Sequence, residues 1–154
     1  MNTIEQILKK ELKLSDDMCS RFLELVETKH LKKKELFVQQ GKVCYSLGII
    51  ESGVLRSYIE KDAVEFIKDF YFPGSIVVSY GSFLTGEPSI GSIQALEETY
   101  LITLSRSSYG QLLQESSEWF KSGKYISDSL LIKKCRRETS FLMDNAFERY
   151  KLLL

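Results

Sequence analysis

The 154-residue chain is poor in the residue types that build metal sites and disulfide frameworks. It has a single histidine, His30, and three widely separated cysteines, Cys19, Cys44 and Cys135. This spacing contains no Cys-x-x-Cys pair and no cluster suited to zinc, haem or an iron–sulfur centre. We therefore expect no metal and no cofactor, and we expect buried thiols in a protein of the reducing cytoplasm.

The chain also lacks an excess of charge and any long apolar run. Lysine plus arginine and aspartate plus glutamate number 21 each, so the net charge is zero, which argues against binding nucleic acid through the overall field. No apolar run approaches the roughly 18 residues that cross a membrane, and Met1–Glu5 does not resemble a signal peptide. No His–carboxylate or Cys–His set is grouped in the turn-rich region, so we predict no catalytic residue and no enzyme.

Two helical patterns open the chain. Apolar residues in 3–13 recur at the helical period and predict an amphipathic helix: Ile4, Ile7, Leu8 and Leu12. Ser15 is expected to cap a second helix, because Asp16 and Asp17 follow it in the first turn, where the helix dipole favours anions.

From Lys29 to Leu104 the pattern changes to period two and indicates about eight short strands. Such spacing is typical of an antiparallel barrel or jelly roll, so the predicted fold class is α+β with an eight-stranded β-roll. We expect two hairpins, one turning at Glu51–Gly53 and one pairing 92–96 with 100–104 around Glu97–Thr99.

The densest cluster of turn-forming residues lies in 72–97 and includes Gly74, Gly81, Gly86, Pro88 and Gly91. We expect tight loops here rather than a regular element. A backbone of glycine and small hydroxyl residues between strands can approach a ligand closely and offer N–H donors to an anion. The alternative is a surface connection without a ligand.

After the strands, Ser105 is expected to cap a short helix, and Ser116 or Ser117 a long one that ends near residue 143. The long helix has apolar residues over most of its circumference, so one stripe can cover the roll and another can pair with a second copy across a dimer axis. The alternative is packing wholly within its own domain. Our candidate residues for the dimer seam are Ile126, Leu130, Leu131 and Cys135.

Asn145 and Glu148 have the spacing of a capping box and predict the start of another helix. We interpret 144–154 as the beginning of a further domain, after a roll with its flanking helices in 1–115 and a dimerisation helix in 116–143. The alternative is a terminal helix that folds back.

In this order of elements the chain resembles the sensory half of Crp/Fnr-type transcription regulators, particularly a branch found in Bacteroidetes-like bacteria. The motifs that carry the resemblance are Ile50–Arg56, Phe72-Pro73-Gly74, Ser82–Pro88, Ser92–Glu97 and Glu148-Arg149-Tyr150. The resemblance implies a cytoplasmic homodimer that senses a small-molecule effector and binds DNA through a winged helix-turn-helix outside these residues. The alternative function is a standalone small-molecule-binding β-roll without a DNA-binding role.

The resemblance also implies a ligand site, with two departures from the pattern of cyclic-nucleotide binders. Ser75 stands where those proteins have the glutamate that holds the ribose, and Ser89-Ile90-Gly91 stands where they have an Arg-Ser/Thr-Ala trio. A phosphate would lose its charge-assisted partner, so we expect no response to cyclic AMP. The candidate ligand-binding residues are Gly74, Ser75, Ile76, Phe83, Ser89, Ile90, Gly91, Ser92 and Lys133, the last as a possible replacement for the arginine.

Overall fold

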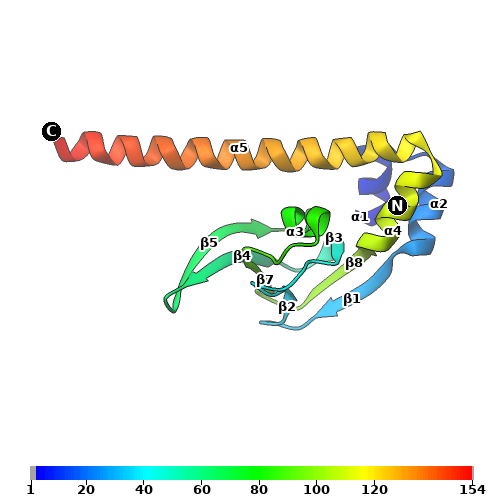
Figure 1. The fold of residues 1–154 in the computed structure, drawn as a ribbon, viewed down its shortest axis with the longest axis horizontal. Helices are drawn as coiled ribbons and strands as arrows, with labels where there is room; N and C mark the ends of the chain where they lie inside the picture. The colour runs from blue at the N-terminus through cyan, green and yellow to red at the C-terminus, as the bar shows by residue number, and fades with distance from the viewer. Residues whose placement is uncertain (1–2, 154) are drawn as a thin grey trace.

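The computed structural model describes residues 3–153 and shows a two-sheet β-roll with helices at one end and a long helix running past it (Figure 1). The strands are β1 (Glu27–Leu31), β2 (Leu36–Val38), β3 (Ser46–Ser52), β4 (Leu55–Lys61), β5 (Val64–Tyr71), β6 (Ile76–Val77), β7 (Ser92–Ala95) and β8 (Thr99–Ser105). The helical elements are α1 (Thr3–Gln6), the π-helical segment η1 (Ile7–Glu11), α2 (Asp16–Leu25), α3 (Tyr80–Thr85), α4 (Arg106–Glu115) and α5 (Ser117–Leu153).

The eight strands form two four-stranded antiparallel sheets, which confirms the predicted β-roll and the α+β class. One sheet has the order β1-β8-β3-β6 and the other the order β2-β7-β4-β5. Apolar side chains of both sheets meet between them, because alternate residues of a strand point to one face. Fully buried members of this core include Ile49, Ile50, Leu55 and Leu101.

Both predicted hairpins are wrong, because the chain changes sheet at each of the two turns. β3 and β4 lie in different sheets, and so do β7 and β8. Gly53 makes the first crossing possible: it has a φ of +101°, and a Cβ there would stand 2.6 Å from the Thr99 Cα. The period-two pattern identified the strands correctly but carried no information about which strands pair.

The N-terminal helices cover one end of the roll as the apolar spacing predicts. Ile4, Ile7, Leu8 and Leu12 are all buried. The Ser15 hydroxyl accepts a hydrogen bond from the Met18 N–H at 3.2 Å, which confirms the predicted cap of α2. These helices and the sheet of order β1-β8-β3-β6 close an apolar core with α4 and the start of α5.

The thiols follow the prediction only in part. Cys19 and Cys44 are buried, and burial raises the pKa of both thiols. Cys135 is exposed on α5, so the expectation of buried thiols is wrong for this residue. His30 is a surface residue of β1 and stacks on Tyr100 with ring centroids 4.4 Å apart.

The two C-terminal helices begin at predicted caps, but α5 is longer than expected. The Ser105 hydroxyl accepts from the Ser108 N–H at 3.0 Å, and the Ser116 hydroxyl accepts from the Glu118 N–H at 3.0 Å. The predicted helix end near 143 and the new start at Asn145 are wrong, because α5 continues unbroken to Leu153. Figure 1 shows α5 extending well beyond the roll. The assignment of 144–154 to a further domain stays a prediction.

None of the described helices is long and apolar enough to span a lipid bilayer.

Candidate functional site

The corner at Phe72–Ser75 is a closed turn whose polar groups bond to one another and to β3. Gly74 has a φ of +91°, and its N–H donates to the Ile50 carbonyl at 2.8 Å. The Ser75 N–H donates to the Phe72 carbonyl at 2.9 Å, and the Ser75 hydroxyl accepts from the Phe72 N–H at 3.2 Å. The predicted ligand contacts Gly74 and Ser75 therefore already have partners here. Ile76 is half-buried next to them in β6.

The turn-rich region contains a helix, α3, where the sequence analysis expected only loops. Its Phe83 is 1% exposed and packs edge-on against Tyr109 of α4, with centroids 5.4 Å apart, so it is a core residue rather than a surface ligand contact. The helix ends at Gly86, which has a φ of +78° and donates its N–H to the Ser82 carbonyl. Glycine spacing alone did not reveal the helix, because Gly81 lies inside it.

Arg106 is a functional candidate that the sequence analysis missed. It is the first residue of α4, and its guanidinium reaches the C-terminal end of α3. The Nε donates to the Phe83 carbonyl at 2.7 Å and Nη2 donates to the Leu84 carbonyl at 3.3 Å. A cation therefore lies beside the loop, but it binds the last carbonyls of a helix, where a positive charge is favourable.

The loop that follows α3 places its three predicted contacts in three different environments. Ser89 is 3% exposed, and its hydroxyl has no hydrogen-bond partner. Ile90 is 74% exposed. Gly91 lies against β4 so closely that a Cβ would stand 2.6 Å from the Tyr58 carbonyl oxygen. The Ser92 hydroxyl accepts from the Gln40 N–H at 2.8 Å. Ser89 is therefore the buried polar group of this loop that still needs a partner.

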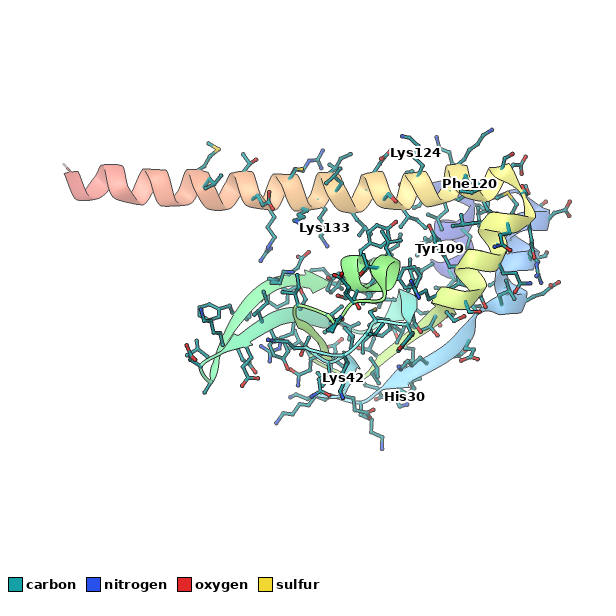
Figure 2. All side chains as sticks on the ribbon, in the orientation of Figure 1. His30, Lys42, Tyr109, Phe120, Lys124 and Lys133 are labelled. Carbon is teal, nitrogen blue, oxygen red and sulfur yellow. The ribbon has the colours of Figure 1, made fainter. Side chains whose placement is uncertain are left out.

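Lys133 lies on the side of α5 that faces the roll (Figure 2). Its Nζ lies 2.8 Å from the Oδ2 of Asp69 in β5 and 4.9 Å from the centroid of the Tyr71 ring. Arg137 adds a second contact, with Nη1 3.6 Å from the Asp69 Oδ1. The Lys133 charge thus meets a carboxylate rather than the serines of the loop.

The comparison with protein-family models matches residues 28–116 to the cyclic nucleotide-binding domain. This match covers more than half of the chain. The chain belongs to this family. A search of the curated proteins finds no match.

Solved structures with this cyclic nucleotide-binding fold confirm the architecture. Catabolite Activator Protein of Thermus thermophilus is 20% identical with a TM-score of 0.70, over 85% of this chain and 59% of that one. The sensor domain of the transcriptional regulator DNR from Pseudomonas aeruginosa is 18% identical with a TM-score of 0.67, over 90% of this chain and 91% of that one. The regulatory domain of Toxoplasma gondii PKA with cAMP is 18% identical, covers 71% of this chain and 42% of that one, and has a TM-score of 0.63. The chain therefore spans 59% of the length of the Thermus protein.

Within this cyclic nucleotide-binding domain, Arg56 has a structural role. It lies 2.8 Å from Glu65 of β5, donates to Gln94 of β7 at 2.8 and 3.1 Å, and stacks 4.3 Å above the Tyr58 ring. These partners tie three strands of one sheet together. Arg56 is therefore not a spare cation for the loop.

The candidate dimer residues of the domain separate into two groups. Ile126 is 6% exposed and lines an apolar cavity with Trp119 and Leu112, and Leu130 packs partly against the same core. Leu131 is 60% exposed, and Cys135 is also exposed. Because Ile126 is already buried in its own chain, the exposed pair Leu131 and Cys135 is the better candidate for a second copy.

Proposed function

We propose that this chain is the effector-sensing and dimerising part of a Crp/Fnr-type transcription regulator, and that its effector is not cyclic AMP. The family match supports a sensing domain, and similarity in fold to the DNR sensor domain supports a role in regulation. Recognition of DNA by the whole protein would belong to residues outside this sequence. The role is binding rather than catalysis.

The observation that carries the dimerising role is an exposed stripe of apolar side chains along α5, interrupted by Lys124 and Glu138. Phe120, Leu131 and Leu142 are 60%, 60% and 67% exposed, and Cys135 is exposed as well. Phe120, Leu131 and Leu142 are eleven residues apart, which turns only about 20° around a helix, and Cys135 lies one turn after Leu131, so these four side chains lie on one face. That face is about 140° around the helix from the one through which Ile126 and Leu130 contact the roll. An apolar stripe on a long helix favours pairing with the same stripe of a second copy.

The natural cysteine on this stripe allows a direct test. In a parallel dimer the two Cys135 thiols come close together, so mild oxidation should yield a disulfide-linked dimer. Cys135→Ser is the control that should abolish the product, while Cys19→Ser should leave it, since Cys19 is buried. A monomer at 50 μM in sedimentation equilibrium, with no cross-linked product, would contradict the proposal.

A further inference from the structure

Two cations of α5 converge on one carboxylate of β5. Lys133 and Arg137 approach different oxygens of Asp69, at 2.8 Å and 3.6 Å. The two positions are four residues apart, so both side chains leave the same face of the helix. With two positive charges against one negative charge, the group retains a net positive charge where α5 passes the roll.

The two cations of this group are about half exposed to solvent, and the carboxylate between them is less exposed. The side chains of Lys133 and Arg137 are 47% and 52% exposed, and that of Asp69 is 22% exposed. Ion pairs at this degree of exposure contribute little to stability, so replacing the carboxylate costs little. Asp69 also keeps a bond of its own when the cations leave, because its Oδ1 accepts from the Phe70 N–H at 2.8 Å.

The site has an aromatic wall. The Lys133 Nζ lies 4.9 Å from the Tyr71 ring centroid, a cation–π distance that holds the ammonium in place. Burial, the largest cause, raises the pKa of the Tyr71 hydroxyl, so this phenol remains uncharged at neutral pH. The positive charges of Lys133 and Arg137, next to the uncharged Tyr71 ring, can bind an oxyanion.

The same group ties the outer part of α5 to the roll. In the described chain, Leu130 is the last α5 residue that packs with the apolar core. Lys133 and Arg137 lie beyond it and reach β5 through the ion pairs with Asp69 and the contact of Lys133 with the Tyr71 ring.

We propose that Lys133, Arg137 and Tyr71 form a binding site for a small carboxylate or phosphate ligand, which Asp69 occupies when no ligand is bound. The ligand anion displaces Asp69 from the two cations and so releases α5 from β5. This inference deepens the proposed sensing function by naming the ligand class and the contact that the ligand changes. It assigns Asp69, Tyr71 and Arg137 a role that the sequence did not indicate.

The test is a titration of the full chain with inorganic phosphate, followed by NMR at the Phe70 amide, whose N–H donates to Asp69. Sodium chloride keeps the ionic strength constant. We expect a saturable shift in the wild type. Asp69→Asn should bind phosphate about tenfold more tightly, because it removes the competing charge. The double variant Lys133→Gln/Arg137→Gln should lose binding by at least about tenfold.

Glu65→Gln is the matched control, because Glu65 lies in the same strand but pairs with Arg56 inside the sheet. It should bind phosphate as the wild type does. Equal affinities for Asp69→Asn and Glu65→Gln, or a shift that chloride alone reproduces, would overturn the proposal. Neither readout depends on dimerisation, so this failure is distinguishable from failure of the sensing and dimerising function, which the Cys135 cross-link tests.

Discussion

Gly91 fixes the position of the loop that follows α3. A side chain at this residue would collide with the backbone of β4, since its Cβ would stand 2.6 Å from the Tyr58 carbonyl oxygen. A backbone atom in a paired strand cannot move aside easily. The loop can therefore lie this close to β4 only because Gly91 has no side chain.

We predict that Gly91→Ala destabilises the chain by about 1–3 kcal/mol, because either β4 or the loop must shift. The measurement is urea denaturation followed by circular dichroism. Gly81→Ala is the matched control: a Cβ there has nothing within 4 Å, and alanine favours the helix that contains it. Equal losses in the two variants would contradict the steric account.

Tyr109 connects α4 to α3 and α5 through its ring and hydroxyl. Burial, and then the neighbouring Tyr80 hydroxyl, raises the pKa of Tyr109 to about 12 from the ordinary 10.0. The Tyr80 hydroxyl in turn lies 2.6 Å from the Ser127 hydroxyl of α5. The folded state thus favours the protonated phenol.

A raised pKa of an acid makes the folded state bind more protons than the unfolded state between pH 10 and pH 12. The contribution of Tyr109 is therefore complete below pH 10 and is lost as the pH rises through the folded pKa. We expect the urea midpoint to fall over this range, and to fall less steeply in Tyr109→Phe, which keeps the ring packed on Phe83. Identical slopes for the two proteins would refute this assignment.

At the scale of elements, α5 has two faces with different partners. One face, with Ile126 and Leu130, completes the core of its own chain. The other presents Leu131 and its stripe to solvent. The sequence indicates more than one apolar face on this helix, but Ile126, a predicted seam residue, is buried in the core of its own chain. The directions of Ile126 and Leu131 differ by only about 140° around the helix axis. The helical spacing of apolar residues therefore does not show by itself which of them packs in the core.

We predict that Leu131→Glu weakens self-association by at least about tenfold without lowering the thermal midpoint of the dilute chain. The reason is that Leu131 is 60% exposed in a single chain, so the charge meets solvent until two helices pair. Sedimentation equilibrium measures the association. Arg136→Glu changes charge at an exposed position on a different face of α5 and should have a much smaller effect. Equal weakening by both variants would argue for a general charge effect instead.

At the scale of the whole molecule, the roll has the fold of cyclic nucleotide-binding domains but not their expected charges. By the resemblance, Ser89 stands where an arginine is expected, and two arginines of the roll and α4 have internal partners: Arg106 binds the end of α3, and Arg56 binds Glu65 and Gln94. We therefore expect no arginine of this loop to pair with the phosphate of a cyclic nucleotide.

We predict a dissociation constant for cyclic AMP above about 10 μM in isothermal titration. Loss of a charge-assisted contact from a desolvated site costs roughly 2–5 kcal/mol, which corresponds to about 30-fold to several thousand-fold in affinity. Tighter binding would mean that a cation not yet identified reaches the phosphate.

Much of the local structure could be predicted because it depends on neighbours in sequence. Ser15, Ser105 and Ser116 each cap a helix through a bond to an N–H two or three residues ahead, and such pairs are visible in the sequence. The strands and the buried face of the first helix follow from side-chain period in the same way. The capping-box pattern at Asn145 shows the limit, because α5 continues through it.

The sequence by itself determined the α+β class, the number of strands and the starts of α2, α4 and α5, since each of these is written in residues a few positions apart. Only the tertiary structure decided that the chain changes sheet at Gly53, that Ile126 belongs to the core, and that Asp69 meets Lys133. Contacts of this kind join residues distant in the chain. They depend on how the faces of two different elements pack together. The spacing of apolar residues along one helix or strand shows which side is buried, but not which element packs against it.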